Sequence, residues 1–193
     1  MNRINKLIVV IFLLIVSISF GQQKAKYVFL FIGDGMGDNS IYATEMYQAS
    51  LNGQKNYTPL SFSQFPVQSF MTTFSANNLI TDSSASGTAM ATGEKTNNHW
   101  VSLDPVHKTK QETIAEKAKK TGYKVGIISS VTIDHATPAS FYAHQESRGD
   151  YHEIALQLPL SNFDFFGGGG VHDLGDKSDK NSVAYQLNKY GYK

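Results

Sequence analysis

The chain has 193 residues, with 17 Lys and Arg, 16 Asp and Glu, and no cysteine. This balanced charge, without a basic block, excludes a nucleic-acid-binding surface that depends on charge. The lack of cysteine excludes disulfides and thiolate metal sites, so oxygen and imidazole atoms must hold any metal ion. The length is sufficient for one domain with a substantial core.

Residues 1–22 have the features of a secretory signal. Two basic residues, Arg3 and Lys6, precede an almost unbroken apolar run of 14 residues from Leu7 to Phe20. That run is short for a membrane span, which needs about 20 residues. We therefore predict a removed signal peptide and a secreted or periplasmic protein over 23–193, with no membrane attachment after cleavage. An uncleaved N-terminal anchor is the alternative.

Strand and helix patterns alternate along the rest of the chain. Apolar runs predict buried strands, and the 3.6-residue period predicts helices between them. Alternation of this kind indicates an α/β fold with a parallel sheet, in which ligands bind beyond the carboxyl ends of the strands. The predicted strands cover 27–32, 67–73 and 124–129, and the predicted helices cover 39–49, 83–91 and 111–120.

The first candidate motif, Gly33-Asp34-Gly35-Met36-Gly37-Asp38, directly follows the first predicted strand. Its glycine spacing does not fit the dinucleotide-binding fingerprint, and the Asp34 carboxylate would repel a phosphate unless a cation lay between them. A carboxylate at a strand end is a good ligand for a divalent metal. A glycine-rich turn with solvated acids is the alternative.

The second motif is the run of small and hydroxyl residues from Thr81 to Gly93, which contains Asp82 and Ser83. A hydroxyl in the first turn of a helix lies where free N–H groups and the helix dipole favour an anion. A metal or a base would have to activate Ser83 as a nucleophile. A simple helix cap is the alternative.

The third cluster follows the strand predicted over 124–129. Asp134, His135 and Thr137 gather oxygen and nitrogen donors there, and Arg148 could clamp a phosphoryl group through two hydrogen bonds. The alternatives are an ordinary helix start at Thr137-Pro138 and a surface arginine.

Other candidates carry less information. The stretch from Phe163 to Phe166 is predicted to be a strand that runs into the loop Gly167–Gly170. That loop is predicted to be a structural turn, followed by the polar residues His172 and Asp173. Residues His99 and His152 have no evident partner in the sequence and are predicted to be surface residues, as is His107.

The order and spacing of these motifs closely resemble the alkaline phosphatase family, from about Lys26 to the glycine loop. The resemblance implies a three-layer α/β/α fold with a mostly parallel central sheet. It also implies hydrolysis of small phosphate monoesters, and a homodimer is compatible with it. No nucleic-acid partner is expected.

The resemblance also implies a role for each matching residue. Ser83 matches the nucleophile that becomes a phosphoserine, Asp82 the acid that orients it, and Arg148 the arginine that holds two phosphoryl oxygens. Among metal ligands, Asp34 matches the carboxylate that bridges one of two zinc ions and a third site. That third site is usually occupied by magnesium.

The remaining matches concern this third metal, and Ser83 itself would also contact zinc. Thr137 matches a hydroxyl ligand near the third metal, and His135 falls where some members have Asp and others His. The identity of the third metal ion is therefore left open between members of the family.

Near the end of the chain, residues 187–193 repeat the helix-to-strand pattern of residues 118–124. We expect from this an N-terminal portion of a longer domain, with most zinc ligands beyond Lys193 and no significant activity in the 193 residues alone. The competing functions are a related phosphodiesterase or sulfatase-like hydrolase and a secreted phosphate- or metal-binding protein without turnover.

Overall fold

The computed structural model describes residues 25–193, so the predicted signal peptide over 1–22 lies outside the described residues. The chain falls into two compact units, Met1–Met36 and Gly37–Lys193, and each is described by itself. Among residues 25–193, no helix combines the length and the apolar character that crossing a membrane requires.

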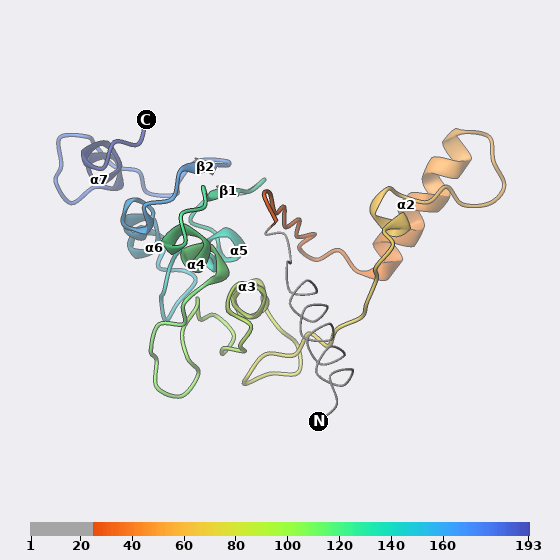
Figure 1. Ribbon diagram of the computed structural model, residues 1–193, viewed down its shortest axis with the longest axis horizontal. Helices are drawn as coiled ribbons and strands as arrows, with labels where there is room; N and C mark the ends of the chain where they lie inside the picture. Colours follow the sequence, from red (N-terminus) through yellow and green to blue (C-terminus); the bar gives the residue numbers. More distant parts are fainter. Residues whose placement is uncertain (1–24) are drawn as a thin grey trace, which may run out of the picture. The chain divides into compact units, whose positions relative to one another are not determined.

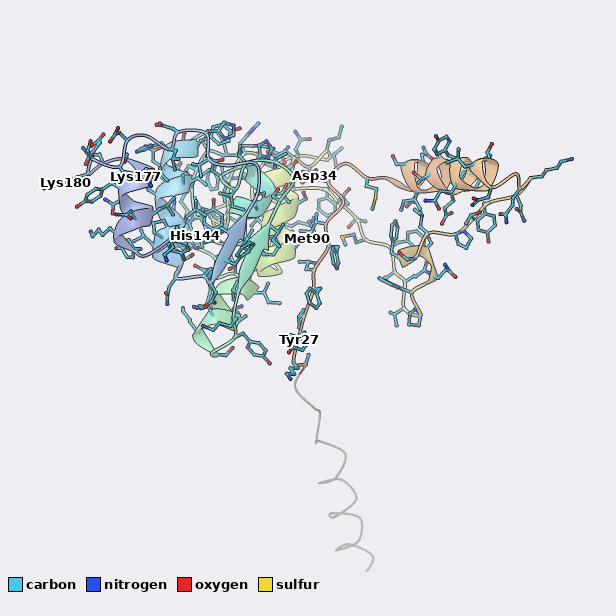
Figure 2. The ribbon with its side chains drawn as sticks, turned by 90° about the horizontal axis from the view of Figure 1, so that it is seen from above. Tyr27, Asp34, Met90, His144, Lys177 and Lys180 are labelled. Atoms are coloured by element: carbon cyan, nitrogen blue, oxygen red, sulfur yellow. The ribbon has the colours of Figure 1, made fainter. Side chains whose placement is uncertain are left out.

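The first unit contains the segment 27–32, for which the strand prediction is wrong. The segment is extended but pairs with no strand of the described residues. The side chains of its first five residues are exposed, from 58% at Leu30 to 88% at Phe31, and Figure 2 shows Tyr27 on this extended stretch. An apolar run predicts burial, but a strand forms only where a neighbouring strand accepts and donates its hydrogen bonds.

The second unit begins with helix α2, Asp38–Leu51, which confirms the helix predicted over 39–49. The Glu45 carboxylate of α2 accepts a hydrogen bond from the Leu60 N–H at 3.0 Å, shortly before the 3-10 helix η1, Phe62–Gln64. The strand predicted over 67–73 is wrong, because this stretch is irregular and its large apolar side chains are exposed.

Two short parallel strands, β1 (Gly126–Ile128) and β2 (Phe165–Gly167), form the sheet of the described residues. They confirm the strand predicted over 124–129, at reduced length, and the strand that leads into the glycine loop. Figure 1 shows them side by side, with helices α4, α5 and α6 gathered next to them. The parallel order fits the predicted α/β class, since the chain between the strands forms helices.

Local capping signals explain where helices α3 and α4 begin. Helix α4, Ile114–Lys120, starts after a capping box in which Thr113 and Glu116 bond each other's backbone N–H. Helices α3 (Ser83–Thr92) and α4 confirm the helices predicted over 83–91 and 111–120, although α4 begins three residues later than predicted. The last helices are α5 (Ala136–Ala139), α6 (Tyr151–Gln157), the 3-10 helix η2 (Pro159–Ser161) and α7 (Val183–Lys189).

Helices α3 and α5 pack closely because Gly87 has no side chain. A Cβ atom at Gly87 would lie 2.7 Å from Ser140 Oγ and 3.6 Å from Thr137 Cα. The Ser140 hydroxyl is completely buried and donates to the Ala136 carbonyl oxygen at 2.9 Å. This close approach brings the helix that starts at Ser83 against the one that contains Thr137.

A partly buried His144–Glu116 pair joins α4 to the chain that follows α5. His144 Nε2 lies 3.0 Å from Glu116 Oε1, and His144 Nδ1 lies 2.9 Å from the Ser102 carbonyl oxygen. Figure 2 places His144 among the packed elements of this unit. Burial raises the pKa of the Glu116 carboxyl, but the hydrogen bonds from His144 and from the Thr113 N–H outweigh it and lower the pKa overall.

We predict that Gly87→Ala lowers the free energy of unfolding by about 1 kcal/mol. Alanine normally stabilises a helix interior, but here overpacking against the buried Ser140 exceeds that gain. Urea unfolding followed by circular dichroism measures the change.

Gly126→Ala is the control for Gly87→Ala, since an added Cβ at Gly126 lies 3.5 Å from Phe165 Cβ, an ordinary van der Waals contact. Adding Ser140→Gly to Gly87→Ala removes the clashing atoms and restores part of the loss. A Gly87→Ala protein more stable than wild type would contradict the packing argument.

Candidate functional site

The site predicted around Ser83 is built on the N-terminus of helix α3. Asp82 is the N-cap residue, and its carboxylate accepts hydrogen bonds from the Ala85 N–H and the Ser84 hydroxyl, both at 2.9 Å. Ser83 is the first residue of the helix and is partly exposed. The capping role considered for Asp82 is therefore present in the structure, with Ser83 in the first turn beside it.

The same carboxylate brings Arg148 to this helix start. Arg148 Nη1 lies 3.3 Å from Asp82 Oδ2, and the His99 N–H donates to that oxygen at 2.9 Å. The Arg148 side chain is 24% exposed and that of Asp82 is 17% exposed, so solvent screens the pair only in part. Two motifs 66 residues apart in sequence thus meet at Asp82.

The Asp82 carboxyl is held in its ionised form. Burial raises its pKa, but the hydrogen bonds from the Ala85 and His99 N–H groups, the Ser84 hydroxyl and Arg148 outweigh burial and lower the pKa below 3.8. The negative charge of this carboxylate at neutral pH keeps the Arg148 guanidinium oriented towards the helix N-terminus.

His135 and Thr137 lie at the other helix of the site. His135 is the N-cap residue of α5 and Thr137 lies in its only turn, which packs on α3 near Gly87. An imidazole and a hydroxyl two residues apart offer nitrogen and oxygen donors to a divalent cation. Within residues 25–193, however, no group of three or more His, Asp or Glu side chains is arranged to hold a metal ion.

Asp34 belongs to the first unit, whereas the other predicted site residues belong to the second. The structure therefore brings Asp82 and Arg148 into contact and packs the helices of Ser83 and Thr137 together. The proposed metal role of Asp34 remains a prediction.

The structure also brings in the backbone of His99, while the imidazole is 74% exposed, which confirms the prediction of a surface side chain. His99 adopts a left-handed conformation with φ of 72°, so that its N–H reaches Asp82 and its carbonyl oxygen accepts the Arg148 N–H at 2.7 Å. The imidazole lies 3.7 Å from Asp82. Such a conformation in a residue other than glycine has no local signal that would have identified it.

Comparison with known proteins gives concordant results. A sequence model of the family described as alkaline phosphatase matches residues 25–176. Alkaline phosphatase 3 of Bacillus subtilis (strain 168) is 33% identical over 181 residues, which are 89% of this chain and 38% of that protein.

Solved structures agree with this match. A cold-active alkaline phosphatase from the psychrophile Shewanella sp. superposes with a TM-score of 0.69 at 30% identity, covering 84% of this chain and 39% of that one. A variant of TAB5 alkaline phosphatase, in which a histidine is replaced by aspartate and Mg is bound in the M3 site, gives 0.64 at 34% identity over 74% of this chain and 41% of that one. The predicted fold class is confirmed, and the chain spans less than half the length of these relatives.

We predict that Asp82→Asn lowers the free energy of unfolding by about 1 kcal/mol at pH 7, because the charge-assisted hydrogen bonds become neutral ones. The lowered pKa means that the stabilisation is present above pH 3.8 and is lost as the pH falls through the folded-state value. Urea unfolding at a series of pH values measures this.

The difference in the free energy of unfolding between wild type and Asp82→Asn should therefore disappear as the pH falls below 3.8. A gap that stays constant from neutral to acid pH would contradict the charge argument. Ser86→Ala in the same helix, which leaves the Asp82 carboxylate intact, controls for general acid sensitivity.

Proposed function

Because the chain belongs to the alkaline phosphatase family, we propose that its natural protein hydrolyses phosphate monoesters and that Ser83 is the nucleophile. The contact between Arg148 and Asp82 at the start of α3 is the observation that carries the proposal. It joins the predicted phosphate-binding cation to the helix turn of the predicted nucleophile.

The proposed reaction has two displacements at phosphorus. Ser83 Oγ forms a bond to phosphorus while the ester P–O bond breaks, and the leaving alkoxide takes a proton to become the alcohol. Water then attacks phosphorus, the Oγ–P bond breaks, and inorganic phosphate and the serine hydroxyl are released. Asp82 caps the helix and so holds the backbone of Ser83 in place throughout.

Arg148 is proposed to bind two equatorial oxygens of the phosphoryl group. A guanidinium matches two such oxygens with parallel hydrogen bonds, and their negative charge is stabilised in both displacements. Asp82 keeps one Arg148 nitrogen engaged, which restricts the rotation of the side chain before the substrate binds.

We propose that two zinc ions and one magnesium ion complete the site. Bound metal ions would lower the pKa of the serine hydroxyl and of water and would stabilise negative charge on oxygen. Ser83 and Asp34 are the proposed donors to zinc, with Asp34 also reaching the third metal. His135 and Thr137 are the proposed donors to that third ion.

A relative bears on the identity of the third metal ion. The TAB5 enzyme binds Mg in its M3 site when a histidine is replaced by aspartate or by glutamate. With His135 in this chain, the proposal leaves the third metal ion open between magnesium and another divalent cation. The described residues hold too few grouped ligands for a complete metal site, so no catalytic step is assigned to a particular ion.

The proposed cellular context follows from the sequence. Residues 1–22 act as the signal peptide in this proposal, residues 23–193 form the N-terminal portion of the enzyme domain, and the protein works in the periplasm or outside the cell. Its partners are small soluble phosphate monoesters and, in this proposal, a second copy of the chain. Neither nucleic acid nor membrane binding is part of the proposal.

We predict that Ser83→Ala lowers kcat/KM for 4-nitrophenyl phosphate by about 1000-fold or more in the full natural protein with zinc and magnesium present. The loss is large because the nucleophile itself is removed. Phosphate release measures activity, and acid quenching with labelled phosphate detects the phosphoserine, which should be absent from the variant.

Ser86→Ala is the matched control, because Ser86 lies in the same helix and donates to backbone carbonyl oxygens. It should keep wild-type activity within about threefold. An active Ser83→Ala protein would contradict the nucleophile assignment. Phosphate binding by a wild type that lacks turnover would favour the binding-protein alternative, and greater activity on sulfate esters or phosphodiesters would favour a related hydrolase.

We predict that Arg148→Ala weakens inhibition by inorganic phosphate about 10- to 100-fold, because charge-assisted hydrogen bonds worth about 1.5–3 kcal/mol are lost. Arg148→Lys should recover only part of this affinity, since an ammonium group cannot bind two oxygens in the same planar way. The inhibition constant of phosphate measures both effects. Equal inhibition of wild type and Arg148→Ala would exclude Arg148 from phosphate binding.

A further inference from the structure

Asp134 and His172 form a pair next to the predicted metal-binding turn. The Asp134 side chain is completely buried. Its carboxylate accepts the His172 backbone N–H at 2.8 Å and lies 2.9 Å from His172 Nδ1. A buried carboxylate with two donors from one residue fixes both the backbone and the ring of that residue.

The contacts of His172 Nδ1 assign its proton. Nδ1 faces the Asp134 carboxylate and lies 3.0 Å from the Thr132 hydroxyl oxygen. When the Asp134 carboxylate acts as the acceptor in this contact, Nδ1 carries the hydrogen. The His172 ring is therefore held by a directional bond and cannot rotate without losing it.

The loop that contains His172 and Asp173 also contacts the start of helix α6. The rings of Tyr151 and His172 are stacked, with centroids 3.8 Å apart and an angle of 17° between the planes. His152 Nδ1 lies 3.2 Å from Asp173 Oδ2. Two consecutive residues of α6 thus meet two consecutive residues of the loop, just after the segment that contains Arg148.

Tyr151 also contacts the other side of the site. Its ring centroid lies 6.4 Å from that of His135, with 28° between the planes. One tyrosine ring therefore contacts both the imidazole fixed by Asp134 and the imidazole proposed to face the third metal ion. Asp134 and His135 are neighbours in the chain. The contacts from Asp134 to His172, from His172 to Tyr151 and from Tyr151 to His135 therefore form a closed ring of residues.

The glycine loop continues this attachment along the backbone. The Gly169 N–H donates to the Val131 carbonyl oxygen and the Ile133 N–H donates to the Gly170 carbonyl oxygen, both at 2.9 Å. A Cβ at Gly168 would lie 2.9 Å from the Val131 carbonyl oxygen, so glycine is needed for this approach. The loop therefore holds the segment that leads to Asp134 and His135.

We propose that Asp134, His172 and Tyr151 are positioning residues that hold the turn of His135 and the start of α6 at a fixed separation. This inference rests on the proposed function, because the proposed function assigns metal binding to the turn of His135 and phosphate binding to Arg148. His172 acts through Asp134 and Tyr151 and does not itself touch substrate. The unit would set the orientation of the His135 imidazole before magnesium binds.

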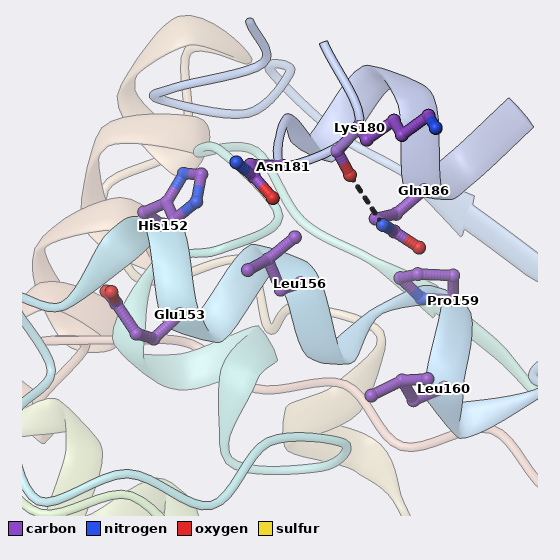
Figure 3. A pocket seen from close by; sticks show the side chains of 8 residues that line it. All are labelled: His152, Glu153, Leu156, Pro159, Leu160, Lys180, Asn181 and Gln186. Atoms are coloured by element: carbon purple, nitrogen blue, oxygen red, sulfur yellow. Dashed lines mark hydrogen bonds between the residues drawn. The ribbon is translucent and has the colours of Figure 1, made fainter.

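A pocket of about 340 Å³ next to His152 is not lined by Asp134, His172 or Tyr151. It lies between α6 with η2 and the chain that enters α7, and Figure 3 shows His152, Leu156 and Pro159 on one wall and Asn181 and Gln186 on the other. None of the residues that line it is a predicted site residue. The contacts of the positioning unit are therefore made on the side of α6 that packs against the loop of His172.

The test compares His172→Ala with His172→Asn in the full natural protein. Asparagine keeps an N–H donor near the place of Nδ1, whereas alanine leaves the buried Asp134 carboxylate with the backbone donor alone. Calorimetric titration with Mg²⁺ should show an affinity about tenfold weaker for His172→Ala, the size expected when an outer hydrogen bond to a metal site is lost. His172→Asn should recover most of it.

His144→Asn is the matched control, since it breaks another partly buried histidine–carboxylate pair, with Glu116, that contacts none of these three residues. It should lower the melting temperature without changing the Mg²⁺ affinity. Unchanged Mg²⁺ affinity in His172→Ala, with a lowered melting temperature, would overturn the proposal and leave a purely structural pair.

Hydrogen exchange separates this proposal from the proposed function. In His172→Ala the amides of residues 132–137 should exchange about tenfold faster than in wild type, whether or not the protein binds metal. If wild type neither binds Mg²⁺ nor hydrolyses monoesters, the proposed function fails, while faster exchange still supports the positioning unit. Unchanged exchange would overturn the unit even in an active enzyme.

Discussion

The carboxylate of Asp82 is the group on which the site depends. It caps helix α3, accepts the N–H of the strained residue His99 and pairs with Arg148. Each contact is modest in energy, but together they join three chain segments that are far apart in sequence. Since an ionised carboxylate accepts several hydrogen bonds at once, a single side chain can define the relative positions of the segments.

Buried hydroxyl groups hold the surrounding helices together where larger apolar side chains would not fit. The Thr88 hydroxyl accepts the Ser102 N–H at 2.9 Å, the Ser102 hydroxyl donates to the Ser140 carbonyl oxygen at 2.6 Å, and the Thr113 hydroxyl donates to the Phe141 carbonyl oxygen at 2.8 Å. Small residues with directional hydrogen bonds are compatible with the short distance between α3 and α5 that the absence of a side chain at Gly87 allows. Hydrogen bonds fix the relative positions of these segments, because small side chains bury little apolar surface.

Sequence reasoning succeeded where the signal is local. The caps at Asp82 and Thr113 and the β-forming run before the glycine loop all lie within a few residues of the elements they define. The stretch 27–32 misled because burial depends on neighbouring strands.

The long-range contacts of the site had no comparable signal. Residues such as Asp134 and His172 stand 38 positions apart, and nothing near either residue identifies the other as its partner. The backbone role of His99 was missed for a different reason, since it depends on a left-handed conformation that is uncommon in residues other than glycine. The positions and residue types of the candidate site were accessible from the motifs, but their connections were not.

The exposed run Tyr27–Ile32 has a consequence for handling the protein. Its six residues are all apolar or aromatic, with no charge, proline or glycine, and five of them are more than half exposed. Extended segments of this composition stack readily with copies of themselves into cross-β assemblies. In a preparation where this segment stays uncovered, self-association through it would compete with folding, so solubility would fall steeply with protein concentration.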